Sequence, residues 1–132
     1  AVVHAAPQSL YSVWGSSGSD VFTVGDGGTM MHYNGSAWSA MVSGTNWLLH
    51  GVWGSSGSDV FAVGEGGPIL HYDGSSWTAM TGDIDEFLFD IWGSSGSDVF
   101  EVGSGGMRHY DGTAWNPMAS GTSQWPRPPA RS

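Results

Sequence analysis

The sequence contains no cysteine and no lysine, and its only strongly basic residues are three arginines among 132 residues. The missing cysteine excludes disulfide scaffolds, zinc ribbons, iron–sulfur clusters and a cysteine nucleophile. Twelve acidic residues give a formal net charge of -9. This charge argues against nucleic acid and anionic membranes as partners, because both reward clustered lysine and arginine. No apolar run reaches the ~18 residues of a membrane-spanning helix, so no membrane insertion is expected.

Glycine is abundant, with 22 residues, but it follows no Gly-X-Y period, which excludes collagen. Eight tryptophans and five phenylalanines are too many aromatic residues for a disordered tract. The length suits one domain with a modest core, and nothing in the composition indicates a cofactor. The composition therefore indicates a folded, glycine-rich domain without bound prosthetic chemistry.

One block of ten residues occurs three times. It runs from Val13 to Phe22, returns unchanged at residues 52–61, and returns at residues 91–100 with only its first residue altered. The tryptophans at its second position are spaced by 39 residues and again by 39. Each copy continues with a His-Tyr-Asn/Asp-Gly motif and a further tryptophan. The chain is therefore built from three copies of one unit.

Each unit divides into four short strands separated by turns. In the second copy the strands are expected near residues 48–53, 59–64, 68–72 and 77–81. Asp73-Gly74 is a signal for a two-residue hairpin. Residues 60–63 are apolar on both faces, as expected of a strand sandwiched between neighbouring sheets. Four strands in about 40 residues is the size of one propeller blade. The sequence thus predicts an all-β fold, a β-propeller with three four-stranded antiparallel blades.

The blades are expected within residues 1–118, as repeats at about 10–47, 48–86 and 87–118. Residues 1–6 align with an outer strand and are expected to form an extra one. Residues 116–120 compete with residues 1–5 for the same place. Residues 119–132 are expected to form a tail, because prolines 126, 128 and 129 cannot donate hydrogen bonds to a sheet.

Three blades leave two apolar faces open, since known propellers close with roughly four to eight blades. We therefore expect self-association, most simply a homodimer that makes six blades around a two-fold axis, with domain swapping of the first strand as a low-cost route. The alternative is a longer protein from which this piece was cut. Because the sequence begins at Ala1 and shows no signal peptide, a processed or excised piece is expected.

The repeated string Val-Trp-Gly-Ser-Ser…Asp-Val-Phe-x-Val-Gly-x-Gly-Gly…His-Tyr-Asp-Gly-x-x-Trp resembles a bacterial β-propeller repeat. That repeat occurs in tandem in large, mostly secreted or surface proteins, and it is distantly similar to the Asp-box repeats of sialidase-like propellers. The resemblance covers roughly residues 10–118. It implies the propeller fold and favours a secreted or cell-surface location, and it implies no particular activity.

The repeated polar residues are expected to be structural. His32, His71 and His109 occupy one equivalent position in separate blades, so we expect each to bond to a neighbouring strand instead of sharing a metal. The aspartates that follow the Gly-Ser turns are expected to accept backbone N–H bonds there; they are Asp20, Asp59 and Asp98. Among the tryptophans, Trp14, Trp53 and Trp92 are assigned to the core, and Trp38, Trp77 and Trp115 to structure.

An enzyme is not expected. A sialidase-like site needs an arginine cluster, and only Arg108 lies within the repeats. Asp83, Asp85 and Glu86 could supply paired carboxylates, but they fall in one loop. We interpret that loop as solvated and acidic, with a weak calcium site as the alternative. No other metal site is expected.

Binding has more support, because two sets of loops should open on one face of a propeller. Small polar residues beside tryptophan suit a sugar, whose ring face packs on the aromatic ring and whose edges bond to hydroxyl or amide groups. The candidate ligand-binding residues are Trp47, Trp125, Asn46, Asp26 and Glu65. The expected function is non-enzymatic binding or structural display with a protein or glycan partner. The alternative is a carbohydrate-binding lectin with repeated sites between blades, which multivalency would strengthen.

Overall fold

The structure, a computed structural model, describes residues 9–65, 69–80, 87–104 and 106–118. Three antiparallel four-stranded sheets follow one another along the chain, and we call them blades 1, 2 and 3. The strands of blade 1 are β1 (Leu10–Ser17), β2 (Asp20–Gly25), β3 (Met30–Tyr33) and β4 (Trp38–Met41). Those of blade 2 are β5 (Leu49–Ser56), β6 (Asp59–Gly64), β7 (Leu70–Tyr72) and β8 (Trp77–Ala79). Those of blade 3 are β9 (Leu88–Ser95), β10 (Asp98–Gly103), β11 (Gly106–Tyr110) and β12 (Trp115–Met118).

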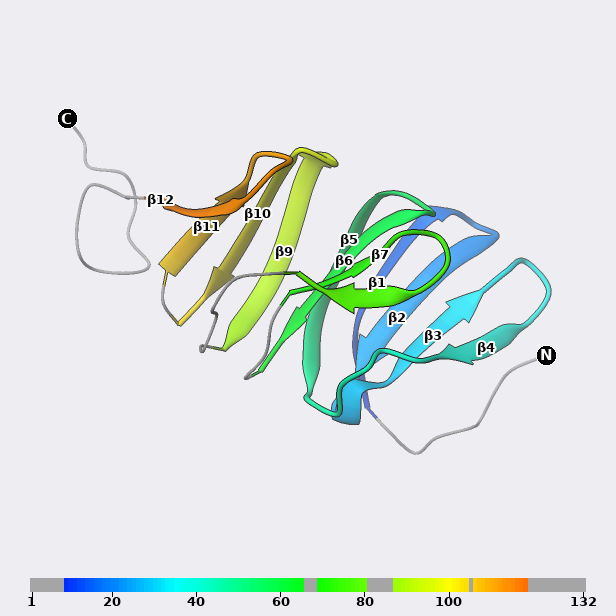
Figure 1. Cartoon of the computed structure of the whole chain (residues 1–132). Coiled ribbons are helices and arrows are strands. Elements are labelled where there is room, and N and C mark those ends of the chain that lie inside the picture. Colours follow the sequence, from blue (N-terminus) through cyan, green and yellow to red (C-terminus); the bar gives the residue numbers. More distant parts are fainter. Residues whose placement is uncertain (1–8, 66–68, 81–86, 105, 119–132) are drawn as a thin grey trace.

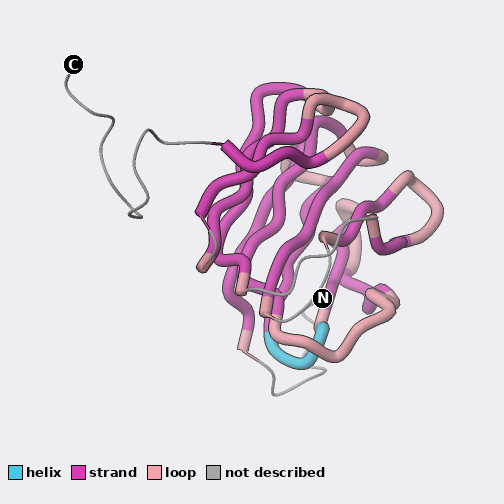
Figure 2. Tube along the Cα trace, turned by 60° about the vertical axis from the view of Figure 1, so that its left-hand side comes forward, coloured by secondary structure: helices cyan, strands magenta, loops and turns pink. Residues whose placement is uncertain are grey.

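The blades stand side by side with blade 2 in the middle (Figure 1). Each blade is ordered as it is in sequence, from its first strand to its fourth. The first strands β1, β5 and β9 make the most extensive contacts between blades, so they form the inner edge of the arrangement. The long strands run nearly alongside one another in Figure 2, with the loops gathered at their two ends.

The second strands confirm the expected burial on both faces. Val60, Phe61, Ala62 and Val63 of β6 are all buried, because one face of blade 2 packs on blade 1 and the other on blade 3. The bounds of β6 also match the expected strand at residues 59–64. Strand β5 runs further than expected, to Ser56, because Ser56 still pairs with Asp59 across a bulge.

The outer hairpins differ from the expected two-residue turn. In blade 2 the strands end at Tyr72 and resume at Trp77, which leaves a four-residue loop. Its Asp73 side chain accepts the N–H groups of Ser75 and Ser76 at 2.8 and 3.1 Å. Only Gly74 needs a positive φ, of 100°. By accepting two N–H groups, the Asp73 side chain stabilises the four-residue loop. The predicted two-residue hairpin was therefore wrong.

Two apolar clusters fill the spaces between blades. The cluster between blades 1 and 2 joins Phe22, Val24 and Met30 to Leu49, Val52, Val60, Ala62, Leu70 and Trp77. The cluster between blades 2 and 3 joins Phe61, Val63 and Ile69 to Leu88, Ile91 and Val99. Each blade therefore uses two faces. We call the face that packs on the next blade along the chain the front face, and the opposite one the back face.

At both junctions between blades, a tryptophan of the front face lies on a glycine of the next blade. A Cβ atom on Gly54 would lie 2.8 Å from Cη2 of Trp14, and one on Gly93 would lie 2.8 Å from Cη2 of Trp53. Both tryptophans pack against the apolar clusters, as expected of core residues. The assignment of Trp92 to the core was wrong, since its side chain is 60% exposed. No following blade is present among the described residues to cover it.

Candidate functional site

A set of three polar side chains recurs in every blade. In blade 1 the Nε2 of His32 on β3 donates to Oδ1 of Asp20 on β2 at 2.6 Å, and the hydroxyl of Ser16 donates to the other carboxylate oxygen. His71 and His109 make the same bond at 2.6 and 2.7 Å, and Ser55 and Ser94 repeat the second one. The histidines thus bond to a neighbouring strand, as the sequence predicted.

These sets differ from a nucleophilic triad. In such a triad the serine donates to the imidazole, which removes its proton, whereas here Ser16 donates to the carboxylate. Burial by itself raises the pKa of Asp20, but the hydrogen bonds from His32 and Ser16 outweigh it and lower that pKa. The expectation that Asp20 accepts backbone N–H bonds was wrong: Oγ of Ser17 accepts the turn's N–H, from Ser19, at 3.2 Å.

The loops at the opposite end of the strands from these turns form one surface, which we call the loop face. It consists of the turn after β2, Glu65 at the end of β6, the loop between β4 and β5, and the beginnings of the first strands β1, β5 and β9. The hydroxyl of Ser43 fixes the loop to the turn by donating to the carbonyl of Gly28 at 2.8 Å. The N–H groups of Asp26, Glu65 and Ser104 bond to residues that lead into the three inner strands.

Three rings cross the loop face in a row, one from each inner strand. Tyr11, His50 and Phe89 occupy equivalent places in β1, β5 and β9, and we call them the central row. The ring centroids of Tyr11 and His50 are 6.1 Å apart, and those of His50 and Phe89 are 5.8 Å apart. Each ring belongs to a residue skipped by the pairing register of its strand. Such bulges re-aim side chains and are frequent beside binding sites.

Carboxylates hold two of these rings. The hydroxyl of Tyr11 donates to Oδ1 of Asp26 at 3.3 Å, and Nε2 of His50 donates to Oε2 of Glu65 at 3.2 Å. Four large aromatic side chains of the loop face remain between 40% and 49% exposed; they are Tyr11, Trp47, Phe87 and Phe89. A cluster of large, exposed aromatic side chains is typical of an interaction surface.

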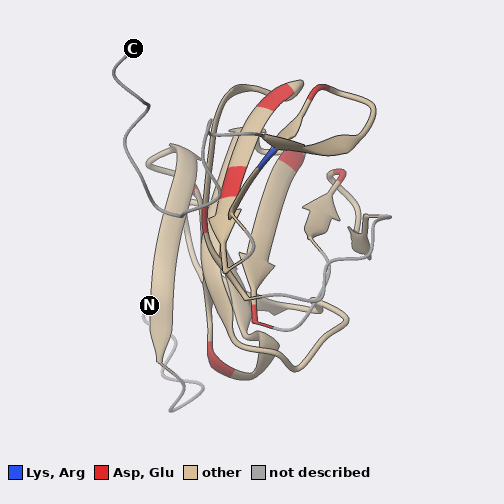
Figure 3. Ribbon diagram, turned by 90° about the vertical axis from the view of Figure 1, so that its left-hand side faces the viewer, with Lys and Arg blue, Asp and Glu red and all other residues tan. Residues whose placement is uncertain are grey.

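Acidic residues, red in Figure 3, dominate the charge of the described residues, which include a single arginine and no lysine. That side chain, Arg108 on β11, lies opposite Glu101 on β10, with Nε 3.4 Å from Oε2. Glu101 is 1% exposed on the back face of blade 3. The equivalent pair in blade 2 is Ala62 and Leu70. Among the described residues no three acidic or histidine side chains gather closely enough to hold a metal ion.

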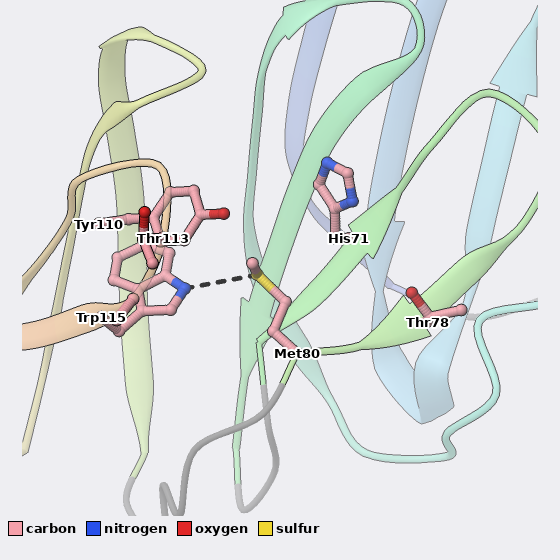
Figure 4. Close-up of a pocket in the computed structure, with 7 residues that line it drawn as sticks. His71, Thr78, Met80, Tyr110, Thr113 and Trp115 are labelled. Carbon is pink, nitrogen blue, oxygen red and sulfur yellow. Dashed lines mark hydrogen bonds between the residues drawn. The ribbon is translucent and has the colours of Figure 1, made fainter.

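Two equivalent pockets lie between the outer strands of neighbouring blades. The pocket between blades 2 and 3 has a volume of about 410 Å³, and the one between blades 1 and 2 has about 330 Å³. Figure 4 shows the first, where Tyr110 and Trp115 of blade 3 face Met80 of blade 2. Nε1 of Trp115 donates to the sulfur of Met80 at 3.4 Å. His71, Thr78 and Thr113 supply its polar lining.

The structure brings most of the predicted ligand-binding residues to the loop face. Asp26 and Glu65 hold the central row, Trp47 is exposed, and Asn46 lines a shallow groove of about 500 Å³ beside Gly28. The remaining predictions lie outside the described residues. They are Trp125, the acidic loop with Asp83, Asp85 and Glu86, the extra strand at residues 1–6, and the tail at 119–132.

Sequence reasoning missed the central row. Its signal was present, because positions 11, 50 and 89 are spaced by the repeat period and all carry a ring. The three residues differ in kind, however, and the bulges that point them outward follow from strand register, which the sequence does not display. None of the described helices is long and apolar enough to cross a membrane.

Comparison with protein-family models and with the sequences of characterised proteins finds no match. Comparison with solved structures finds YCF48, described as bound to D1 peptide, with a TM-score of 0.69 and 17% sequence identity. The match covers 87% of this chain and 44% of the YCF48 chain. The fold is a β-propeller. Three of its antiparallel four-stranded blades lie in the described residues, and the chain spans less than half the length of this neighbour.

Proposed function

We propose that the chain is a non-enzymatic binding module whose loop face takes an extended polypeptide segment carrying arginine or lysine side chains. The central row is the observation that carries this proposal. Its ring centroids are 6.1 and 5.8 Å apart. In an extended peptide, side chains on one face repeat about every 6.6 Å. Alternate side chains of such a peptide match this spacing, so a segment crossing the inner strands would reach all three rings.

The charge of the site favours cationic side chains. Asp26 and Glu65 lie at the central row, and the formal net charge of the chain is -9. Guanidinium groups also interact favourably with aromatic faces, by about 0.5–1 kcal/mol at exposed sites. The YCF48 structure, with its bound peptide, is consistent with a propeller that recognises polypeptide. The Ser–Asp–His sets, whose serine donates to the carboxylate, give no support to an enzyme.

Peptide titration tests this proposal. The probe is a fluorescein-labelled decapeptide that alternates arginine and serine, and the control peptide alternates glutamate and serine. We expect the arginine peptide to bind and the glutamate peptide not to bind, with affinity falling as salt rises. Tyr11→Ala and Trp47→Ala should each weaken binding about tenfold, which corresponds to about 1.4 kcal/mol. Equal affinity for both peptides, or unchanged affinity in both variants, would refute the proposal.

Trp92→Ala is the matched control, since Trp92 is also an exposed tryptophan but belongs to the front face of blade 3. It should leave peptide affinity unchanged. Circular dichroism of each variant confirms that a loss of binding reflects the loop face and not a loss of fold.

Carbohydrate binding is the second candidate, and the equivalent pockets between blades favour it. Tyr110 and Trp115 supply ring surfaces, and Thr78 and Thr113 supply hydroxyls, which is a suitable combination for a sugar. A glycan array probed with the protein tests this candidate. Binding that Thr113→Val weakens would support it, and an array without hits would exclude it.

We also propose that the chain assembles into a ring in which two copies supply six blades, each copy keeping its own loop face. Three blades are fewer than the roughly four to eight of closed propellers. The resemblance to tandem bacterial repeats accords with such an assembly, because each unit is built to contact another unit of the same kind.

A further inference from the structure

We propose that the front face of blade 3 docks on the back face of blade 1 of a second copy, and that three contacts found at both internal junctions specify this interface. The inference rests on the assembled ring proposed above and names the residues that would close it. Both halves of the interface are present in the described residues, and each carries large apolar side chains that are at least half exposed in the single chain, Trp92 on the front face and Leu10 and Val13 on the back face.

The aliphatic residues of the back face provide the first argument. Val52 and Ile91 are each 5% exposed, whereas the equivalent Val13 of blade 1 is 63% exposed. Leu49 and Leu88 are 2% and 0% exposed, and the equivalent Leu10 is 50% exposed. The same positions are therefore core in blades 2 and 3 and solvent-facing in blade 1. The front face of a second copy would cover them.

The tryptophan contact is the second argument. Trp14 and Trp53 each lie on a glycine of the next blade, Gly54 and Gly93. Trp92 has no such glycine to lie on, and it is 60% exposed. Gly15 is the glycine of blade 1 at the equivalent position, and a Cβ on it would meet atoms of blade 1 alone. One open face thus holds the ring and the other holds the glycine that receives it.

The aspartate contact repeats this complementarity. The carboxylates of Asp20 and Asp59 lie against Gly57 and Gly96 in the turn of the next blade, close to where a Cβ would stand. Asp98 is their equivalent on the front face of blade 3, and its side chain is 45% exposed. Gly18 is the equivalent glycine of blade 1, and a Cβ there would meet nothing within 4 Å.

Aromatic pairs complete the match. Phe22 contacts Tyr72 and Trp77 of the next blade with centroids 5.7 and 6.4 Å apart. Phe61 contacts Tyr110 and Trp115 at 5.8 and 6.2 Å. Phe100 would reach Tyr33 and Trp38 of the second copy in the same way.

The aromatic rings of the two uncovered faces already have the spacing found at the internal junctions. The receiving pair in blade 1, Tyr33 and Trp38, has ring centroids 5.2 Å apart, against 5.3 and 5.1 Å for the equivalent pairs in blades 2 and 3. The ring of Phe100 lies 4.6 Å from that of His109, against 4.5 and 4.8 Å in blades 1 and 2. Preorganised surfaces lose little entropy on docking.

Two such contacts close a two-fold symmetric ring, because each copy offers one front face and one back face. The mass in solution tests this directly. Sedimentation velocity at about 10–100 μM should give twice the chain mass of 13.9 kDa. Trp92→Ala and Gly18→Asp should each raise the dissociation constant at least tenfold. Gly18→Asp acts by placing a carboxylate against Asp98 of the second copy.

Trp47→Ala is the matched control for association, because it removes an exposed tryptophan from the loop face. It should leave the mass of the assembly unchanged while weakening binding of the arginine peptide. Trp92→Ala should weaken the assembly and leave binding of the arginine peptide unchanged. The two proposals can therefore fail independently of each other.

A cross-linking experiment uses the natural absence of cysteine. A Gly18→Cys chain mixed with an Asp98→Cys chain should form a disulfide-linked pair under mild oxidation. A Gly18→Cys chain mixed with a Ser36→Cys chain should not form this pair. Ser36 is exposed in the outer hairpin of blade 1 and does not belong to the front face of blade 3. A single-chain mass at a hundred micromolar, or equal cross-linking of both mixtures, would overturn the proposed interface.

Discussion

The Glu101–Arg108 pair provides a sharp test of how blade 3 packs on blade 2. Both residues lie on the back face of blade 3, where the equivalent positions of blade 2 hold Ala62 and Leu70. Those two apolar residues are 0% and 4% exposed. Three variants are compared with the natural chain: Arg108→Leu, Glu101→Ala, and the double variant that reproduces the blade 2 pair.

The expected magnitudes follow from burial. Arg108→Leu removes the guanidinium that faces a carboxylate with 1% exposure. Breaking a buried ion pair in this way costs about 3–5 kcal/mol. Glu101→Ala should cost less, because the Arg108 side chain is 24% exposed and can turn its charge toward water. The double variant should be close to neutral or more stable by about 1–4 kcal/mol, since apolar replacement of buried pairs often is.

Urea unfolding followed by tryptophan fluorescence measures these differences. With an m-value of about 2 kcal/mol/M, Arg108→Leu should lower the urea midpoint by about 2 M, and the double variant should restore it. Similar m-values across the series would show that the unfolding reaction is unchanged. A double variant less stable than both single variants would refute this account of the interface.

Three further perturbations test other parts of the fold. Gly93→Ala should destabilise the fold by about 1–3 kcal/mol, because its Cβ would lie 2.8 Å from the Trp53 ring. Thermal unfolding at submicromolar concentration measures this loss. Gly18→Ala is the control, since the space around Gly18 is open, and its stability should stay within about 0.5 kcal/mol of that of the natural chain. Asp73→Ala should lower the melting temperature, because it removes the acceptor of two N–H groups. Asp73→Asn should be nearly neutral in the same melts, because Asn34 makes these bonds in blade 1; equal losses would contradict the loop geometry. Hydrogen bonds lower the pKa of four aspartates in the folded chain, Asp20, Asp73, Asp98 and Asp111. These aspartates should therefore contribute fully to stability above about pH 4, and their contribution should decline as the pH falls through the folded pKa values. A melting temperature that stays constant from pH 6 to pH 2 would contradict this prediction.

The repeat and its strand pattern make most of the fold predictable. The strand at residues 59–64 could be predicted because turn signals bound it and its apolar residues on both faces indicate a strand buried between two sheets. The turn at Asp73 could not, since the choice between a two-residue and a four-residue hairpin depends on side-chain bonds to backbone. Trp92 shows the limit of equivalence between copies: its sequence context is that of Trp53, and its exposure differs because burial depends on the blade that follows.

The position of the candidate binding residues could be predicted where it depends on the loops alone. Asp26, Glu65 and Trp47 were expected on the loop face because turns and connecting loops open on one side of a propeller. Tyr11 and Phe89 required knowledge of strand register, because a bulge of one residue determines whether a side chain enters the core or leaves it.

The contact of tryptophan on glycine has a consequence for how such proteins lengthen. Every unit carries both the ring and its receiving glycine, so a gene duplication that adds one whole unit creates a working junction without any new mutation. The contact itself does not determine how many units are present. That number is set by the rotation from one unit to the next, which decides whether the series returns to its start or continues as an open helical filament.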